Sequence, residues 1–401
     1  MTSSLISVED ARERVLRVTP QLETEVVAVE QAYGRVLRED VRAAADVPPF
    51  ACSAMDGYAT SPGPAHRTLK VVGESRAGAP SERAPGTDET IRISTGAAVP
   101  EGAEAVIRQE DVAERGELIE TTAELAPGAN IRRAGEDMRA GATVLSSGSV
   151  LRAAELGAAV AAGAGELSVS RRPRATVLTT GDELRAPGEQ LGPGQIHNSN
   201  AVTLSALARR CGAEVAGAET LRDDPETTRS VLANALAASD LVIVSGGVSV
   251  GPHDHVKPAL AALDVVEQFW GVALQPGKPT WFGSRGEQLV FGLPGNPVSA
   301  VVTFTLFAAP ALAALQGARI IAPPFARTAE LGVSVRRNPH RQQAVRVRLE
   351  SEDGRIVAIP NGPQGSHIVT SLLGAQALAL IPAGEGELVP GTTVALVVLP
   401  D

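Results

Sequence analysis

The order of apolar and polar segments predicts a central run of alternating strands and helices. Short apolar, β-branched segments are typical of strands buried in a parallel sheet, and they occur at 175–179, 214–220, 241–244, 265–269 and 288–291. Amphipathic or alanine-rich segments between them predict helices at 200–211, 225–238 and 257–263. The apolar segment 298–315 predicts a last helix, kinked or divided at Pro310. This order predicts an α/β domain with a doubly wound, mainly parallel sheet and helices on both faces.

The flanking segments follow other patterns. Before the sheet, helices are predicted at 7–18, 31–37 and 151–162 and a strand at 25–29, while β-like pieces between Gly/Pro-rich turns fill 41–140. After the sheet, strands are predicted at 328–335, 344–349, 356–359, 377–381 and 393–399, as in a small β-barrel or sandwich. We therefore predict a discontinuous helical domain (1–43 and 141–171), an inserted β-rich module (44–140), the α/β domain (172–321) and a C-terminal β-barrel (322–401).

Composition limits the classes of partner. The 401 residues carry a net charge of −10, so no basic surplus exists to neutralise nucleic-acid phosphates. No apolar run reaches the roughly 18 residues of a membrane span, and the first residues lack the apolar region of a signal peptide. Cys52 and Cys211 are too few for a disulfide framework or a cysteine metal site. These features predict a cytoplasmic protein that binds neither nucleic acid nor membrane.

Four polar, Gly/Pro-rich motifs each follow a predicted strand, at 180–184, 222–225, 245–249 and 293–297. Open α/β sheets bind ligands beyond the carboxyl ends of their strands, so we expect these motifs to gather at one edge. Gly246 and Gly247 allow a tight turn with backbone N–H groups suited to an anion, and the helix start after Asn296 suits a phosphate.

The same motifs carry carboxylates, namely Asp182, Glu183, Asp223 and, a little further along, Asp254. Carboxylate oxygens suit Mg²⁺ that bridges protein and phosphate, so the residues alone predict a Mg²⁺-dependent nucleotide or pyrophosphate ligand. An ordinary helix N-cap before Pro225 explains the Asp-Asp-Pro turn equally well. Lysine is rare, and Lys257 and Lys278 lie beside Gly/Pro-rich motifs, where an ammonium suits a phosphate or another oxyanion.

Other motifs are absent or ambiguous. The chain has no G-x-G-x-x-G that opens a βαβ unit, no H-E-x-x-H and no C-x-x-C, and Gly277-Lys278 lacks the glycine spacing of a P-loop. His253-x-His255 has no third histidine or cysteine nearby for a metal. Three polar loops of the inserted module, at 53–59, 94–96 and 135–137, taken singly are typical of turns.

In this order, the motifs resemble those of the molybdopterin molybdenumtransferase family (MoeA and the E domain of gephyrin). The resemblance covers nearly the whole chain and rests on Ser53-Ala54-Met55-Asp56-Gly57-Tyr58-Ala59, Ser94-Thr95-Gly96-Ala97, Arg133-Ala134-Gly135-Glu136-Asp137, Thr180-Gly181-Asp182-Glu183-Leu184, Ser245-Gly246-Gly247-Val248-Ser249-Val250-Gly251, Gln275-Pro276-Gly277-Lys278-Pro279, Leu293-Pro294-Gly295-Asn296-Pro297 and Gly365-Ser366-His367.

The resemblance implies an enzyme of molybdenum cofactor biosynthesis. Such an enzyme takes adenylylated molybdopterin and molybdate as substrates, inserts the metal and releases AMP with the help of Mg²⁺. The family also implies a homodimer, whose active site lies between the α/β domain of one subunit and the inserted module of the other. We expect transient contacts with the adenylyltransferase that makes the substrate and with molybdoenzyme maturation factors.

Site residues follow from the same resemblance. It places Glu183, Asp223 and Asp254 at the Mg²⁺, and it assigns catalysis to Glu183, Asp254, Asp56 and Lys278. Substrate binding is assigned to Thr95, Asp137, Asp182, Ser245, Gly246, Gly247, Ser249, Pro294 and Ser366. Gln275 departs from the family pattern, since many relatives carry a second lysine there.

Two other functions fit part of the sequence. An adenylyltransferase or a nucleotide hydrolase on the same fold needs little beyond the α/β domain, so the additional domains count against both. A non-enzymatic dimeric scaffold that binds a partner peptide has no need of the site carboxylates, which therefore favour an enzyme.

Overall fold

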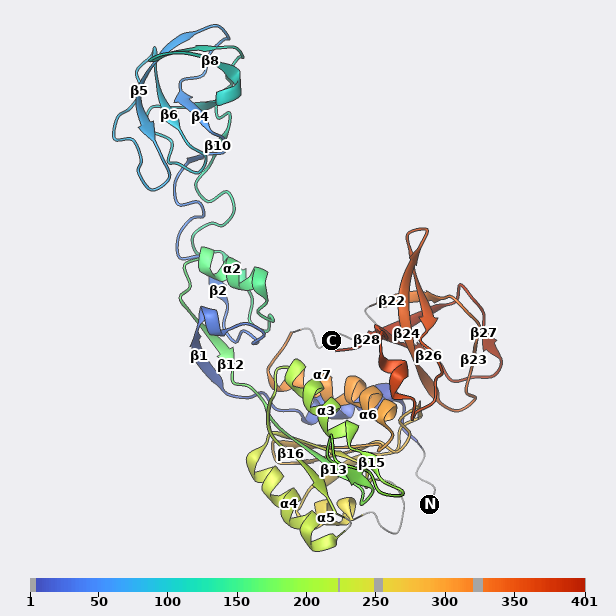
Figure 1. Cartoon of the computed structure of the whole chain (residues 1–401). Coiled ribbons are helices and arrows are strands. Elements are labelled where there is room, and N and C mark those ends of the chain that lie inside the picture. Colours follow the sequence, from blue (N-terminus) through green and yellow to red (C-terminus); the bar gives the residue numbers. More distant parts are fainter. Residues whose placement is uncertain (1–4, 223, 249–254, 320–326, 401) are drawn as a thin grey trace.

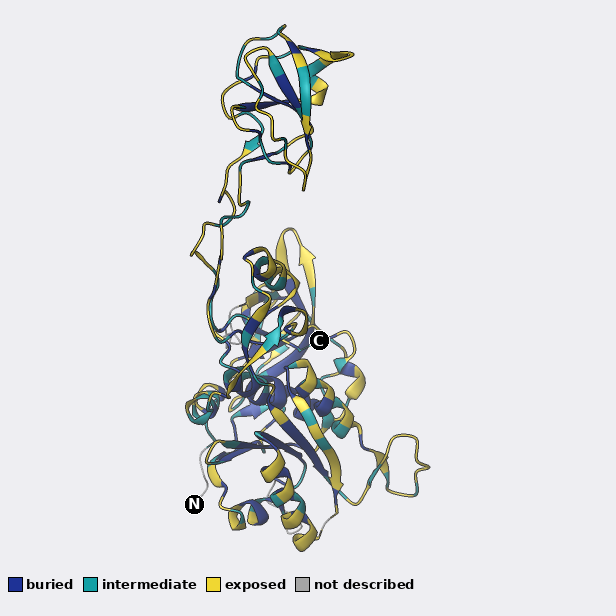
Figure 2. Cartoon of the chain, turned by 90° about the vertical axis from the view of Figure 1, so that its left-hand side faces the viewer, coloured by how far each residue is buried: buried dark blue, intermediate teal, exposed yellow. Residues whose placement is uncertain are grey.

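The computed structural model describes residues 5–222, 224–248, 255–319 and 327–400. Figure 1 shows a six-stranded sheet with helices on both sides, a β-barrel beside it, and a narrow arm that carries a β-rich module at its far end. The central strands of the sheet are buried, whereas the two chain segments that join the arm to the module are largely exposed (Figure 2). The molecule is therefore elongated, and the module is held away from the sheet.

The α/β sheet has the strand order β16-β13-β17-β21-β20-β18. Its members are β13 (Arg174–Thr180), β16 (Glu214–Leu221), β17 (Leu241–Ser245), β18 (Val266–Trp270), β20 (Trp281–Arg285) and β21 (Gln288–Leu293). The first four strands in spatial order run parallel, and β20 runs antiparallel to both of its neighbours. The predicted α/β fold with a mainly parallel sheet is confirmed, although the sequence pattern missed β20.

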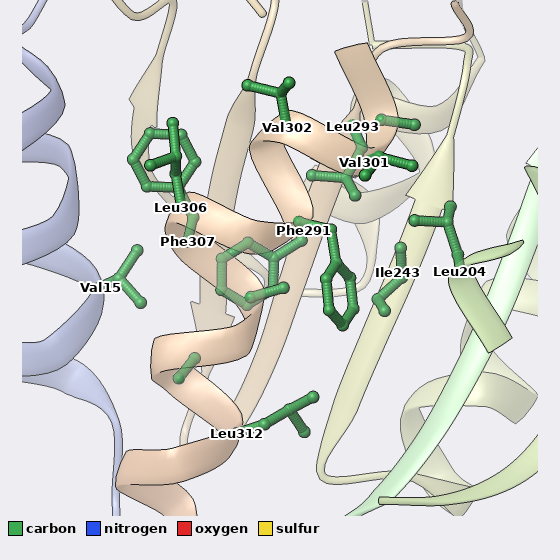
Figure 3. Close-up of a cluster of buried hydrophobic side chains, with 14 of the residues drawn as sticks. Val15, Leu204, Ile243, Phe291, Leu293, Val301, Val302, Leu306, Phe307 and Leu312 are labelled. Carbon is green, nitrogen blue, oxygen red and sulfur yellow. The ribbon is translucent and has the colours of Figure 1, made fainter. Parts of the chain in front are cut away.

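Two hydrophobic cores cover the sheet, because successive side chains of a strand point to opposite faces. Val242 and Val244 pack with α4 (Pro225–Ala238) and α5 (Val256–Ala262). Leu241 and Ile243 pack on the other face, with α3 (Ser199–Arg210) and the long helix 297–315 (Figure 3). The predicted helices on both faces are therefore present.

Helix α1 (Val8–Val18) belongs to the second of these cores. Its start is as predicted, since the Ser7 hydroxyl accepts a hydrogen bond from the Asp10 amide at 2.9 Å. Its buried Val15 faces the helix 297–315 (Figure 3), and Arg14 donates to the Gln268 carbonyl of β18 at 3.1 Å. Helix α1 therefore packs on the α/β domain, and the predicted domain boundaries stay predictions.

The helix 297–315 is divided close to the predicted position. A π-helical segment, η3 (Phe304–Ala308), separates α6 (Pro297–Thr303) from α7 (Ala309–Leu315), whose second residue, Pro310, lacks an N–H. Its 19 residues are long and apolar enough to cross a membrane, which corrects the statement that no run reaches that length. Most of them are buried against the sheet, as in a core helix.

The arm consists of paired short strands and one helix. Its strands are β1 (Thr24–Ala28) with β12 (Glu166–Ser170) and β2 (Val41–Arg42) with β11 (Thr143–Leu145), and its helix is α2 (Ala153–Ala161). The predicted helix at 31–37 is wrong. A single 3₁₀ turn, η1 (Val29–Gln31), is followed by Gly34 at φ +73°, and Val36 and Leu37 then form β-bridges.

The inserted module is β-rich, as predicted. Its sheet has the order β7-β4-β6-β5-β9-β8, with β4 (Gly57–Thr60), β5 (Thr68–Ser75), β6 (Glu89–Ile93), β7 (Ala105–Arg108), β8 (Val112–Arg115) and β9 (Leu118–Thr121). A 3₁₀ turn, η2 (Gln109–Asp111), joins β7 to β8, and β3 (Cys52–Ser53) pairs with β10 (Ile131–Arg132).

The C-terminal domain is a closed barrel, one of the two predicted forms. Five strands form the ring β24-β25-β22-β28-β26, which closes because β24 also pairs with β26. They are β22 (Arg327–Leu331), β24 (Gln342–Glu352), β25 (Arg355–Pro360), β26 (Ala377–Ile381) and β28 (Thr393–Val398). The short elements around it are β19 (Leu274–Gln275), β23 (Val335–Arg336), β27 (Glu387–Leu388) and the 3₁₀ turn η4 (Val369–Leu372).

Candidate functional site

The four predicted motifs gather at the carboxyl edge of the parallel strands. Two neighbouring cavities lie there, one on each side of the loop after β13, and Leu184 lines both. The first, of about 560 Å³, lies between the ends of β13, β17 and β21 and contains Glu183 and Ser245. The second, of about 850 Å³, lies between the loops after β13 and β16 and contains Asp182 and Arg222. Asp182 and Glu183 therefore serve different cavities although they are adjacent.

Asn200, at the start of α3, joins the strand ends around the first cavity. Its amide donates to the Ser245 hydroxyl at 2.9 Å and to the Gly295 carbonyl at 2.7 Å. The Ser245 hydroxyl in turn donates to the Pro294 carbonyl at 3.1 Å. Asn200 was not among the predicted site residues, although its place just after Asn198, the N-cap of α3, could have indicated it.

The two glycines after β17 permit close packing of the strand ends. Gly246 has φ +90°, and a Cβ there would lie 2.8 Å from the Thr180 hydroxyl oxygen. Gly247 has φ +63°. The Gly246 N–H donates to the Leu293 carbonyl at 3.0 Å, so this amide is already used within the protein. Ligand binding by this turn stays a prediction, and Ser249 lies outside the described residues.

Glu183 is an exposed carboxylate of the first cavity and makes no hydrogen bond or ion pair with any described residue through its side chain. Gly181, at φ +144°, makes room for it, because a Cβ there would lie 2.4 Å from Glu183 Oε2. No described residue compensates the charge of this carboxylate. It is therefore suited to bind a cation.

The other predicted magnesium ligands, Asp223 and Asp254, lie outside the described residues. Among the described residues, no group of three His, Cys, Asp or Glu side chains could hold a metal. The ordinary explanation of the Asp-Asp-Pro turn holds for Asp224, which caps α4 by accepting from the Thr227 amide at 2.7 Å. Hydrogen bonds from Thr227 keep the Asp224 pKa below its ordinary value. The three-carboxylate magnesium site stays a prediction.

Ser366 links the barrel domain to the start of α6. Its hydroxyl accepts from the Asn296 amide at 3.2 Å, and its carbonyl accepts from the Val298 N–H at 3.1 Å. Because Pro297 has no N–H and that of Val298 is occupied, this helix start offers fewer donors to a phosphate than predicted. His367 follows Ser366 and lines the first cavity with Glu183.

Arg346 is a fully buried cation that the sequence argument missed. It lies on β24 of the barrel and is 0% exposed. Its Nη2 donates to the Pro363 carbonyl at 3.1 Å and to the Gly365 carbonyl at 3.4 Å, while Nε and Nη1 have no hydrogen-bond partner among the described residues. Burial lowers the pKa of this guanidinium to about 10. An uncompensated cation therefore lies beneath the loop that ends in Ser366.

The three lysines have different surroundings. Lys70 pairs with Glu117 at 3.8 Å, and the Lys257 ammonium lies 5.2 Å from the centre of the Trp270 ring. Lys278 is exposed and forms no ion pair within the described ranges. It precedes β20, whose first residue pairs with the end of β21, so it lies on the same side of the sheet as the two cavities. Gln275 accepts a hydrogen bond from Asn338 at 2.5 Å.

The module residues form contacts of their own, away from the sheet. Asp56 accepts hydrogen bonds from the Thr95 amide at 2.7 Å and from its hydroxyl at 3.1 Å. Asp137 lines a separate cavity of about 510 Å³ with Cys52 and Arg132. Within one chain, the arm separates these residues from the two sheet-edge cavities (Figure 1).

Comparison with known proteins covers each part of the chain. Residues 6–163 match the family described as "MoeA N-terminal region (domain I and II)". Residues 176–314 match "Probable molybdopterin binding domain", and residues 328–399 match "MoeA C-terminal region (domain IV)".

Whole relatives match over nearly their full length. The chain is 35% identical over 397 residues to the molybdopterin molybdenumtransferase of Haemophilus influenzae, covering 98% of both chains. It is 37% identical over 385 residues to molybdopterin molybdenumtransferase 2 of Mycobacterium tuberculosis, covering 91% of this chain and 93% of the relative. A crystal structure of the molybdopterin biosynthesis moeA protein from Pyrococcus horikoshii OT3 superposes with a TM-score of 0.82 at 29% identity, covering 98% of this chain and 100% of the other.

Proposed function

The chain belongs to the molybdopterin molybdenumtransferase family, and we propose that it inserts molybdate into adenylylated molybdopterin with release of AMP, assisted by Mg²⁺. One observation carries the proposal beyond the family. The first cavity is lined by the carboxylate of Glu183 and by His367, which follows the loop whose Pro363 and Gly365 carbonyls accept hydrogen bonds from the buried guanidinium of Arg346. A phosphate-bound cation and an oxyanion therefore each have a partner of opposite charge at one edge of the sheet.

The donor chemistry fits Mg²⁺, because carboxylate oxygens are among its preferred ligands. Glu183 would hold the ion together with Asp223 and Asp254, whose positions lie outside the described residues. Bound there, Mg²⁺ would polarise the phosphoryl group as AMP departs. Asn200 and Ser245 keep the loops around Glu183 in place through their hydrogen bonds.

Molybdate is a doubly charged oxyanion, so its site needs cations and hydrogen-bond donors. Arg346 supplies a buried positive charge whose Nε and Nη1 have no hydrogen-bond partner among the described residues, Ser366 a hydroxyl, and Lys278 an exposed ammonium that no described carboxylate neutralises. Guanidinium groups bind tetrahedral oxyanions well, because their donors match the spacing of the oxygens. These three residues together would hold the molybdate beside the pterin.

The module residues fit a site shared between two subunits. Asp56, Thr95 and Asp137 lie far along the arm from Glu183 of their own chain (Figure 1). In a homodimer, the module of one subunit would instead complete the sheet edge of the other, which is the arrangement we propose. The function then requires both subunits at each site.

The test is AMP release from adenylylated molybdopterin by the purified protein with Mg²⁺ and molybdate. We expect turnover by the wild type, strong loss in Glu183→Ala and Lys278→Ala, and no loss in Glu350→Gln, a surface control on the barrel. Absence of turnover by the wild type would reject the proposal. Synthesis of the adenylylated pterin from ATP, without molybdate-dependent AMP release, would support an adenylyltransferase instead.

Subunit mixing tests the shared site separately. Asp56→Ala and Glu183→Ala should each be inactive alone. A mixed dimer of the two has one intact site, so statistical exchange should restore roughly a quarter of wild-type activity. If both residues served the site of their own chain, mixing would restore nothing, and the shared site would be rejected.

A further inference from the structure

The junction between the arm and the α/β domain contains a three-residue ionic cluster. Arg171 follows β12, the last strand of the arm, and Glu23 precedes β1, to which β12 is paired. Asp240 precedes β17, a central strand of the α/β sheet. The arm narrows to these two chain segments where it meets the sheet (Figure 1). The Arg171 side chain thus links the base of the arm, through Glu23, to the α/β sheet, through Asp240.

Arg171, Asp240 and Glu23 form the cluster, which we call the clamp. Arg171 Nη1 and Nη2 donate to the two oxygens of Asp240 at 2.6 and 2.7 Å, and Nε donates to Glu23. Asp240 also accepts from the Arg174 amide at the start of β13, at 2.7 Å. A bidentate arginine–carboxylate pair fixes orientation as well as distance.

The cluster is partly buried, unlike most ion pairs among the described residues. The Asp240 side chain is 18% exposed and that of Arg171 is 30% exposed. Burial acts to raise the Asp240 pKa, but hydrogen bonds from Arg171 and the Arg174 amide outweigh it and leave the pKa below its ordinary value. Among the described residues, the pair Arg171–Asp240 is the ion pair that joins the arm to the α/β domain.

Other contacts at the junction are single hydrogen bonds and the packing of Leu22 in the core, and they include a bond from Arg172 Nη1 to the Gly212 carbonyl at 3.4 Å. The Leu22 amide donates to the Leu315 carbonyl at 2.8 Å, and the Arg319 amide donates to the Gly148 carbonyl at 2.9 Å. Each of these hydrogen bonds joins one pair of groups, whereas Arg171 contacts Glu23 of the arm and both carboxylate oxygens of Asp240 at once. Loss of the clamp should therefore change the direction of the arm without detaching it.

We propose that Arg171 is a positioning residue for the reaction, which sets the angle of the arm and thereby brings Asp56 and Thr95 of the module to the sheet edge of the other subunit. The inference rests on the shared site proposed above. Arg171 touches no substrate, and its effect passes through the arm. A small error of angle becomes a large displacement at the far end of an elongated arm, and misplacement of a reacting group by about 1 Å can cost roughly 100-fold in rate.

The experiment measures arm direction and catalysis in the same variants. Donor and acceptor dyes are placed on cysteines at Val160 of the arm and Glu226 of α4, both exposed, in a Cys211→Ser background. Each labelled chain is paired with an unlabelled one, and energy transfer is recorded molecule by molecule. Arg171→Met removes the clamp, and Arg171→Lys keeps the positive charge but cannot form the bidentate pair. Arg348→Met removes an exposed ion pair of the barrel and serves as a control.

Arg171→Met should shift or broaden the energy-transfer distribution and lower kcat at least about tenfold, with a smaller change in KM for the pterin substrate because the contacts of the α/β domain are intact. Arg171→Lys should fall between wild type and Arg171→Met, and Arg348→Met should match wild type. A wild-type distribution or a wild-type kcat in Arg171→Met would overturn the proposal. If the wild type released no AMP, the proposed function would fail, while the energy-transfer comparison would still decide whether Arg171 sets the angle. Should Arg171→Met fail to fold, Glu23→Gln weakens the clamp from its exposed end and is judged by the same criteria.

Discussion

Replacement of Arg346 by methionine separates a functional role of this buried cation from a structural one. Methionine is unbranched and adaptable, so it fills most of the volume of the arginine stem. It removes the charge and the two nitrogens, Nε and Nη1, that have no partner among the described residues. If Arg346 is kept for an oxyanion, Arg346→Met should weaken the binding of molybdate while the barrel stays folded.

The expected stability change follows from two opposing contributions. Burial lowers the guanidinium pKa from its ordinary value to about 10, and at about 1.4 kcal/mol per pKa unit this is a cost on the order of 3 kcal/mol. The group is protonated at neutral pH whether folded or unfolded, so the cost is present there in full. Against it stand the hydrogen bonds to Pro363 and Gly365, each contributing roughly 1 kcal/mol. We expect the free energy of unfolding to stay within about 2 kcal/mol of wild type.

Two assays check this prediction. Denaturant unfolding followed by circular dichroism measures stability, and AMP release against molybdate concentration measures function. Loss of a charge-assisted hydrogen bond worth about 1.5–3 kcal/mol should weaken molybdate binding roughly 10- to 150-fold. Destabilisation beyond about 3 kcal/mol would show that Arg346 stabilises the barrel, and an unchanged molybdate dependence would show that it does not bind the oxyanion; either result refutes the reasoning.

Three further changes test the site and the module. Glu183→Gln should reduce AMP release by roughly 100-fold or more because the cation loses its charged ligand. Thermal melts should show an unfolding free energy within about 0.5 kcal/mol of wild type. Turnover equal to that of wild type would contradict the proposed role of Glu183 as a cation ligand. Gly246→Ala should destabilise the α/β domain by more than about 2 kcal/mol, since φ +90° alone costs roughly 1–2 kcal/mol and the Cβ meets a threonine hydroxyl at 2.8 Å. Gly286→Ala is the matched control, with φ +57° and open space around it, and should cost about 1 kcal/mol; equal losses would show that packing does not matter. Burial and the bond to Glu114 raise the Tyr58 pKa from 10 to about 12, so the folded module holds this proton more tightly than the unfolded chain. Its stabilisation is complete below pH 10 and is lost as the pH rises to about 12. Tyr58→Phe should lack that loss in pH-dependent melts, and a loss that persists in the variant would assign it to another group.

The sequence alone determined the α/β sheet and the position of its functional edge. Buried parallel strands are continuous apolar runs, so β13, β16, β17 and β21 could be recognised from local hydrophobicity. Because parallel strands end at the same edge of a sheet, the polar motifs after them were expected to share that edge. Both cavities lie there and are lined by residues of these motifs. The barrel strands were predicted by the same local reasoning.

Other features had no local signal. The pattern at 31–37 resembles a helix, but Gly34 turns the chain and Val36 and Leu37 pair with distant strands. Strand β20 is recognisable as a strand mainly through its pairing with β21 and β18.

Only the tertiary structure decided which charges are compensated. Nothing near Arg346 in the sequence distinguishes it from the many other arginines, because the absence of a counter-ion is a property of the folded barrel. The clamp of Arg171 likewise joins residues 148 and 69 positions apart in the chain. Asp182 and Glu183 are neighbours in sequence but serve different cavities. Short-range patterns encode which residues are buried in strands and helices, whereas the electrostatic partner of a side chain depends on chain segments that meet only on folding.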